Sequence, residues 1–167
     1  IGNGLTLPSG PLREDINNLR FYDNVFLNGN EEYLIGIKNQ IKKINPQINI
    51  NQGKYIPLNI EDFNKEYDYL VFSGIGNHKT FVNMLKNNNL KIVDDLEYPD
   101  HYQYSQKDIN EILNKAKKYH AKIITTEKDY LRLDSVDKTE VLFIKSTLEI
   151  IDEKNFIPTL INLNEKN

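Results

Sequence analysis

Residues 67–77 read Tyr67-Asp68-Tyr69-Leu70-Val71-Phe72-Ser73-Gly74-Ile75-Gly76-Asn77. The run from Tyr67 to Phe72 is rich in aromatic and aliphatic residues and predicts a buried strand. The two glycines that follow predict a tight turn at positive φ, and Asn77 is expected to cap a helix over residues 79–86. A strand, a short turn and a helix in this order are typical of an α/β protein.

Strand and helix signals continue to alternate toward the C-terminus. Residues 90–93 predict the next strand, and Ser105 with Asp108 three residues later predicts a nearly complete capping box at a helix start. The apolar residues of this helix have helical spacing: Ile109, Ile112, Leu113 and Ala116. We expect a strand at 121–125, a short helix through Leu133, a strand at 140–145 and a terminal helix at 156–163.

The N-terminal part carries weaker signals. Pro11 is expected to begin a short helix that includes Arg13, and residues 23–28 predict a short buried strand. Residues 31–44 have helical spacing, although residues 33–37 fit a strand equally well. Residues 48–60 suggest one extended strand or two shorter ones.

Together these elements predict an α/β fold, a three-layer sandwich with a mostly parallel sheet covered on both faces. A length of 167 residues suits one domain with one core. The chain begins at Ile1, inside what reads as a loop, so we expect it to be a piece of a longer polypeptide.

Composition excludes several classes of function. The chain has no cysteine, which rules out disulfides, thiolate metal sites and cysteine nucleophiles. A net charge of −3 gives no electrostatic support for a nucleic-acid partner. No apolar run approaches the roughly 20 residues of a membrane-spanning helix. No phosphate loop of the Gly-x-x-x-x-Gly-Lys-[Ser/Thr] type and no convincing metal spacing is present.

The strongest candidate for proton chemistry is His101, in the run Tyr98-Pro99-Asp100-His101-Tyr102-Gln103-Tyr104. This run lies between a strand and a helix, where α/β proteins expose reactive groups. Asp100 could orient the imidazole ring. The alternative, slightly favoured by spacing alone, is an exposed loop histidine held by its neighbouring aspartate.

Other polar runs have a structural and a functional interpretation. The Gly-x-Gly at residues 74–76 is weak evidence for phosphate binding, because the third glycine of a dinucleotide motif is missing. Glu127 and Asp129 suit a helix N-terminus, whereas Thr126 and Lys128 could face a ligand cleft at the carboxyl edge of the sheet.

Arg13 and Glu14 form one more polar pair near the N-terminus. The planar guanidinium of Arg13 could clamp an anion at the start of a helix. The alternative is an exposed ion pair, worth less than about 1 kcal/mol.

Four separated motifs together resemble the tetraacyldisaccharide 4′-kinases of lipid A biosynthesis. They are Leu-Pro-Ser-Gly-Pro-Leu-Arg-Glu at 7–14, Gly-Ile-Gly-Asn at 74–77, Asp-His-Tyr-Gln-Tyr at 100–104 and Thr-Thr-Glu-Lys-Asp at 125–129. They occur in the family's order with similar spacing. The resemblance implies that this chain is the smaller C-terminal domain of a two-domain P-loop-type kinase.

The resemblance also implies how the chain is divided. Residues 1–22 would be an inter-domain segment with the Leu-Pro-Ser-Gly-Pro-Leu-Arg-Glu motif, and residues 23–167 the C-terminal α/β domain. An N-terminal phosphate-loop domain, which binds most of the ATP and Mg²⁺ in the family, is absent from this chain. No metal ligand is expected here, and this fragment alone should be inactive.

The family's transferase reaction moves the γ-phosphoryl of ATP to the 4′-hydroxyl of a tetraacyl glucosamine disaccharide 1-phosphate, a precursor in lipopolysaccharide synthesis. By resemblance, His101 belongs to an Asp–His pair whose aspartate lies in the missing half, and it is the expected catalytic residue. Candidates for the cleft that holds nucleotide or substrate are Arg13, Glu14, Asn77, Asp100, Thr126 and Lys128.

The family also implies a location and partners. The kinase would act at the cytoplasmic face of the bacterial inner membrane, as a peripheral protein that meets the membrane through its N-terminal segment. Its partner would be the lipid A precursor. The alternative function from a different class is a stand-alone α/β binding module without catalytic activity.

Overall fold

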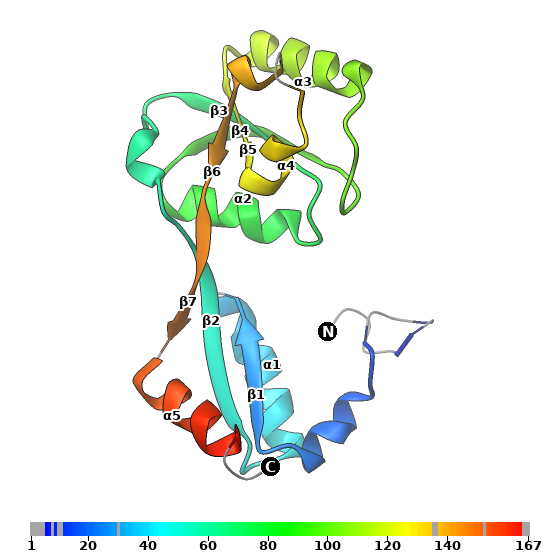
Figure 1. Ribbon diagram of the computed structural model, residues 1–167, viewed down its shortest axis with the longest axis vertical. Coiled ribbons are helices and arrows are strands. Elements are labelled where there is room, and N and C mark those ends of the chain that lie inside the picture. Colours follow the sequence, from blue (N-terminus) through cyan, green and yellow to red (C-terminus); the bar gives the residue numbers. More distant parts are fainter. Residues whose placement is uncertain are drawn as a thin grey trace. The chain divides into compact units, whose positions relative to one another are not determined.

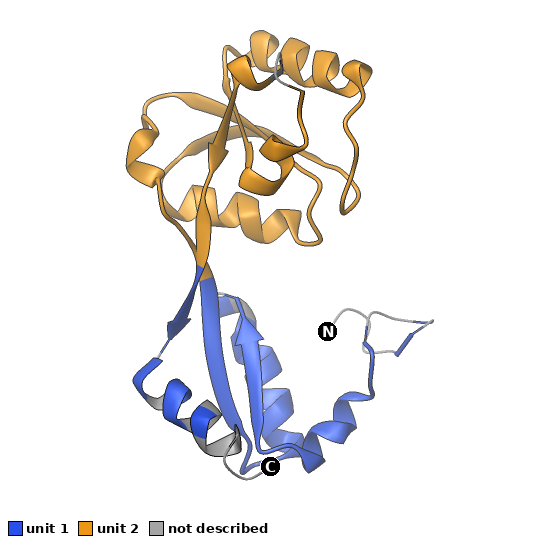
Figure 2. Cartoon of the chain, in the orientation of Figure 1, with its two compact units in different colours: residues 1–54, 148–167 blue, residues 55–147 orange. Residues whose placement is uncertain are grey.

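The computed structural model describes residues 6–7, 9, 12–29, 31–134, 137–151 and 153–164. The chain folds into two compact units, shown in different colours in Figure 2. Unit 1 comprises residues 1–54 and 148–167, and unit 2 comprises residues 55–147.

Unit 2 is built on a four-stranded sheet with the order β4-β3-β5-β6, in which every neighbouring pair is parallel (Figure 1). The central strand β3 (Asp68–Ser73) pairs with β4 (Lys91–Glu97) on one side and with β5 (Lys122–Thr126) on the other. The remaining elements of the unit are β6 (Val141–Ile144), α2 (His78–Asn87), α3 (Gln106–Tyr119), α4 (Glu127–Leu131), η2 (Ile60–Asp62) and η3 (Asp137–Glu140).

Two apolar clusters cover the two faces of this sheet. Successive side chains of a strand point to opposite faces, so Tyr69 and Val71 of β3 join one cluster while Leu70 and Phe72 join the other. The first cluster contains Phe81, Val82, Met84 and Leu85 of α2, and the second contains Ile109, Ile112 and Ala116 of α3. Unit 2 is therefore a three-layer α/β sandwich, which confirms the predicted fold class.

The helices of unit 2 begin with the predicted caps. The side chain of Asn77 accepts a hydrogen bond from the Thr80 amide at 3.1 Å. Ser105 and Asp108 form a complete capping box, in which the Ser105 amide donates to the Asp108 carboxylate at 2.8 Å. The hydrogen bonds from the Ser105 side chain and amide lower the pKa of Asp108.

Unit 1 contains a three-stranded sheet with the order β1-β2-β7. Strand β1 (Asn24–Asn28) runs parallel to β2 (Asn49–Pro57), which is one extended strand. Residues 31–44, for which the sequence allowed helix or strand, form α1 (Glu31–Ile44), and its Leu34 and Ile41 are buried. The other elements are η1 (Ile16–Phe21), β7 (Ser146–Ile151) and α5 (Glu153–Asn164).

Two elements differ from the predictions. The first helix begins at Ile16 rather than Pro11, because Asp15 caps it by accepting from the Asn17 amide, and Arg13 therefore precedes the helix. Pro11 itself lies outside the described residues. Toward the C-terminus, strand β7 follows β6 after one residue, whereas the sequence predicted a strand only at residues 140–145.

The described residues form two sheets, where the sequence suggested a single sheet, and the chain divides into two compact units. Residues 23–54 group with the C-terminal residues in unit 1, and strands β2 and β7 each begin in one unit and end in the other. The function of residues 1–22 as a segment between domains of a longer protein stays a prediction.

Candidate functional site

Three loops of unit 2 meet at the carboxyl edge of its sheet. Strands β4 and β5 both pair with β3, so the loops that follow them lie on either side of the end of β3. The connection after β3 leads to α2 and the first apolar cluster, whereas Tyr130 and Leu133 after β5 pack into the second. Adjacent strands whose connections lead to opposite faces mark the position at which α/β proteins bind ligands.

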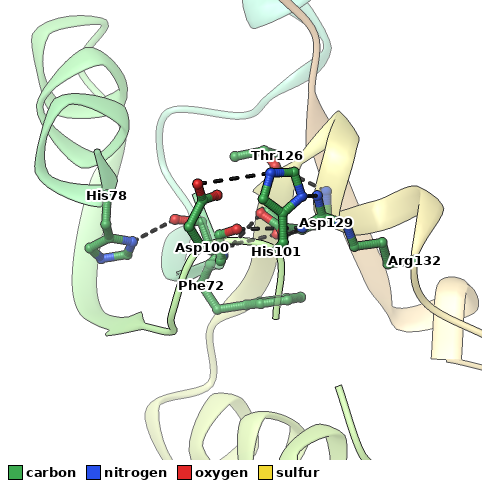
Figure 3. Close-up of polar contacts among 10 residues, drawn as sticks. Phe72, His78, Asp100, His101, Thr126, Asp129 and Arg132 are labelled. Atoms are coloured by element: carbon green, nitrogen blue, oxygen red, sulfur yellow. Dashed lines mark hydrogen bonds and ion pairs between the residues drawn. The ribbon is translucent and has the colours of Figure 1, made fainter. Parts of the chain in front are cut away.

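Asp129 is the polar centre of this edge (Figure 3). Its side chain is fully buried, and its Oδ2 accepts hydrogen bonds from the Gly74 amide at 3.1 Å and from the Thr126 hydroxyl at 2.7 Å. The carboxylate thus joins the loop after β3 to the start of α4. The sequence predicted only a role in the charge balance of the helix N-terminus, which understates what Asp129 does.

Arg132 forms an ion pair with Asp129 and also contacts His101. Its Nη1 donates to Asp129 Oδ1 at 3.1 Å and lies 3.4 Å from the Gly74 carbonyl oxygen. Its Nη2 lies 3.0 Å from Nδ1 of His101. The sequence carries a signal for this pair, because an acid and an arginine three residues apart face each other on a helix.

His101 stands at the solvent end of these contacts. Its backbone has φ of +60° and its amide donates to the Gly74 carbonyl oxygen at 3.0 Å. Histidine is among the few residues that adopt this left-handed region readily. The ring contacts Arg132. The side chain of His101 is nevertheless 81% exposed, so the ring remains accessible to a substrate.

Asp100, the expected orienting group for His101, is a more distant partner. Its Oδ2 lies 3.9 Å from His101 Nε2, and its side chain is 56% exposed. This distance is too long for a hydrogen bond. The closer polar partner of the ring is therefore Arg132, which lies 31 residues further along the chain.

Three tyrosines support the loop that carries His101. The ring centroids of Tyr98, Tyr102 and Tyr104 lie 4.9 to 5.4 Å apart, within the range of favourable aromatic contacts. Burial raises the pKa of Tyr98 to about 12, with the carboxylates of Asp108 and Glu111 adding to the effect. These phenols are therefore packing groups that stay neutral at physiological pH.

Tyr104 lies closest to the polar centre. Its hydroxyl is buried and makes no hydrogen bond of regular geometry with the described residues. Burial raises the pKa of Tyr104 strongly, and the nearby Asp129 carboxylate raises it further. The ring also packs edge-on against Phe72 of β3, with centroids 5.2 Å apart.

Gly74 is required for space and not for its φ, which corrects the expected positive-φ turn: among the described glycines, only Gly29 has positive φ. A Cβ at Gly74 would lie 3.0 Å from the Pro99 carbonyl oxygen and from Cβ of Tyr102.

We expect Gly74→Ala to lower the free energy of unfolding by about 1–3 kcal/mol, measured by urea denaturation. Gly76→Ala is the matched control, because its Cβ would meet Asp100 at 3.7 Å, an ordinary contact. Equal losses for the two variants would contradict this role of Gly74.

His78 is a second structured histidine, which sequence reasoning passed over. The ring is buried, with Nδ1 2.7 Å from the Ser73 hydroxyl and Nε2 2.9 Å from Asp95 Oδ2. Ser73 is fully buried and cannot meet a substrate, so the three residues tie the end of β3 to α2 and β4. No sequence spacing indicates this contact, since Asp95 arrives through strand pairing.

The other predicted residues of unit 2 have different surroundings. Asn77 acts as the cap of α2, and Thr126 caps α4 by accepting from the Asp129 amide at 3.1 Å. Lys128 is exposed. Of these, Thr126 is the one that shares contacts with the Asp129–Arg132–His101 group.

Arg13 and Glu14 lie in unit 1 and are described separately. Both are exposed, and the Glu14 carboxylate accepts a hydrogen bond from the Tyr22 hydroxyl at 3.2 Å. This hydrogen bond and the charge of Glu14 raise the pKa of Tyr22. Pro8, Gly10 and Pro11 of the same motif lie outside the described residues.

Within the described ranges, no group of three or more histidine, aspartate or glutamate side chains could hold a metal ion. The same part of the chain contains no helix that is long and apolar enough to span a membrane.

The fold and the site define an α/β protein with a parallel sheet and a buried polar group that presents a histidine at the sheet's carboxyl edge, the class in which ligands bind at that edge. Residues 1–165 match the model of the tetraacyldisaccharide-1-P 4′-kinase family, so the chain belongs to this family. The predicted resemblance is thereby confirmed.

The chain is 73% identical over 167 residues to a tetraacyldisaccharide 4′-kinase of Pelagibacter ubique (strain HTCC1062), covering 100% of the chain and 53% of the relative. It is 39% identical over 152 residues to the enzyme of the same name from Rickettsia bellii, covering 88% of the chain and 44% of the relative. The chain thus spans about half the length of these relatives.

A crystal structure of LpxK from Aquifex aeolicus, solved in complex with ATP, has a similar fold. The TM-score is 0.50 at 21% sequence identity, and the match covers 94% of this chain and 47% of the other. The part of that protein that matches is again about half of its length.

Proposed function

We propose that this chain supplies the C-terminal half of an ATP-dependent kinase that phosphorylates the 4′-hydroxyl of a tetraacyl glucosamine disaccharide 1-phosphate in lipid A biosynthesis. Its family membership and the names of its relatives support this assignment. In such a kinase, unit 2 would form one wall of an active site completed by the phosphate-loop half.

The observation that carries the proposal is the setting of His101 among the three histidines of the chain. His78 is buried, and His120 follows α3 and precedes β5, which puts it at the amino end of the parallel strands. His101 alone combines exposure with a place at the carboxyl edge, where ligands bind in this class of fold. It is therefore the histidine that we assign to the catalytic Asp–His pair.

Phosphoryl transfer needs a group that aims the acceptor hydroxyl and helps to remove its proton, together with a metal ion and a cradle for the phosphates. We assign the first task to His101 and to an aspartate outside this chain. In this proposal ATP and Mg²⁺ are held mainly by the phosphate-loop half. Arg13, Glu14, Asn77, Asp100, Thr126 and Lys128 remain candidates for the wall of the shared cleft.

We also propose a peripheral location at the cytoplasmic face of the bacterial inner membrane. A tetraacylated substrate has its acyl chains in the bilayer, and its sugar hydroxyl must meet a water-soluble nucleotide at the surface. The half of the protein that precedes this chain would supply the membrane contact.

The test is a chimera in which this chain replaces the matching segment of the Pelagibacter ubique relative, with transfer of labelled phosphate from ATP to the disaccharide as the measurement. We expect the chimera to be active, because the replaced segment is 73% identical, and the isolated chain to be inactive. A folded chimera that transfers no phosphate, beside an active parent relative, would overturn the proposed function.

A further inference from the structure

Arg132 connects the buried interior of unit 2 to the exposed ring of His101 (Figure 3). The two nitrogens of its guanidinium fork have separate partners. Nη1 contacts Asp129 Oδ1 at 3.1 Å and the Gly74 carbonyl oxygen at 3.4 Å, and Nη2 contacts His101 Nδ1 at 3.0 Å. The side chain of Arg132 is 20% exposed, so the fork is largely enclosed by protein.

The contact between Arg132 and His101 determines which nitrogen of the imidazole ring carries the proton. A guanidinium has only donors, so the Nδ1 atom that faces Nη2 must be an acceptor. An imidazole that accepts at Nδ1 is neutral and carries its proton on Nε2. A doubly protonated ring would direct an N–H group at the cationic fork and lose the hydrogen bond.

We propose that Arg132 is a positioning residue that holds the His101 ring through Nδ1, so that the ring presents Nε2–H to the substrate cleft. This inference rests on the proposed function of His101 and adds a residue to it. Asp129 takes part indirectly, because its buried carboxylate fixes the guanidinium plane from the opposite side.

The backbone assists this arrangement. Both the amide of His101 and the fork of Arg132 reach the Gly74 carbonyl oxygen, at 3.0 Å and 3.4 Å. His101 is therefore held at two points: its backbone amide contacts Gly74, and its ring atom Nδ1 contacts Arg132. A ring held in this way acts only as a donor, through Nε2–H, to an oxygen of a carboxylate, a hydroxyl or a phosphoryl group. In the proposed Asp–His pair the ring would therefore orient an oxygen, and the aspartate would be the group that accepts the proton of the hydroxyl.

The geometry requires the fork of an arginine and not merely a positive charge. Arg132 serves Asp129 and His101 with different nitrogens, whereas a lysine has a single ammonium centre. Arg132→Lys should therefore keep the ion pair with Asp129 and lose the contact with the ring. This variant separates the structural role of the residue from its positioning role.

The first test is the protonation pattern of His101 in the chimera, measured by NMR with ¹⁵N-labelled histidine at neutral pH and assigned by the signals lost in His101→Asn. We expect the proton on Nε2 and an unprotonated Nδ1 whose resonance moves in Arg132→Lys. A proton on Nδ1, or identical His101 spectra in the parent and in Arg132→Lys, would overturn the inference.

The second test is a double-mutant cycle on phosphate transfer by the chimera. Arg132→Lys is expected to lower kcat by about 10–100-fold, with KM for ATP and for the disaccharide unchanged and with unchanged thermal unfolding. In the His101→Asn background, Arg132→Lys should have no further effect, because Arg132 acts through the ring. Arg20→Lys, at an exposed arginine of η1, is the control and should leave kcat unchanged.

The outcomes separate this inference from the proposed function. An inactive parent chimera would reject the proposed function, while the NMR measurement would still decide the Arg132–His101 contact. An active parent with unaltered spectra and kcat in Arg132→Lys would reject the inference alone. An equal loss of kcat in both backgrounds would show that Arg132 acts on the substrate directly, which also overturns a positioning role.

Discussion

Replacing His101 by asparagine in the chimera is expected to lower kcat by about 10²–10⁴-fold, the usual contribution of a group that assists proton transfer. Asparagine tolerates the left-handed backbone that residue 101 adopts, with φ of +60°. The amide of residue 101 can still donate to the Gly74 carbonyl oxygen, so the loop should keep its conformation. Steady-state kinetics of phosphate transfer to the disaccharide measures the effect.

His120→Asn is the matched control for this experiment. His120 also has a left-handed backbone, with φ of +53°, and is also exposed, but it ends α3 away from the carboxyl edge. The same chemical change at the same type of backbone should leave kcat unchanged. If the His101→Asn and His120→Asn variants of the chimera had the same kcat, the catalytic assignment of His101 would be wrong.

Replacing Asp129 by asparagine is expected to lower the free energy of unfolding by about 3 kcal/mol, near the lower end of the cost of breaking a buried ion pair. The carboxylate accepts from Gly74, Thr126 and Arg132, and an amide nitrogen in its place would face at least one of these donors. The cost is not larger because Arg132 retains 20% exposure and can be partly hydrated. Urea denaturation of the chain, followed by circular dichroism, measures the change.

Glu127→Gln provides the control for charge. Glu127 lies in the first turn of the same helix α4 and is exposed, so its loss should cost less than about 1 kcal/mol, the value of a favourable charge at a helix N-terminus. Similar losses for Asp129→Asn and Glu127→Gln would mean that the buried hydrogen bonds of Asp129 contribute little to stability.

The elements of unit 2 could be predicted because their signals are local. The buried strand at residues 68–73, the capping box of Ser105 and Asp108, and the cap at Asn77 each depend on a few neighbouring residues. The position of His101 between a strand and a helix follows from the same local order. Alternation of strand and helix then implies parallel pairing, since parallel neighbours need a crossover connection.

Other features were beyond local reasoning. A glycine that is needed for close packing and a glycine that is needed for positive φ look alike in a sequence, and Gly74 is of the first kind. Strand β7 follows β6 after one residue, so no turn signal separates them. The division into two units depends on residues 148–167 joining residues 1–54, a grouping that no short window of sequence records.

The local sequence is sufficient to place His101 on a loop at the carboxyl edge, because backbone propensities and caps act over a few residues. The local sequence is not sufficient to predict which polar side chain contacts the His101 imidazole ring. The adjacent Asp100 stands at 3.9 Å, whereas Arg132, far away in the chain, contacts Nδ1 at 3.0 Å. That choice arises in three dimensions, because β4 and β5 both pair with β3 and thereby bring the loops that follow them together over its end.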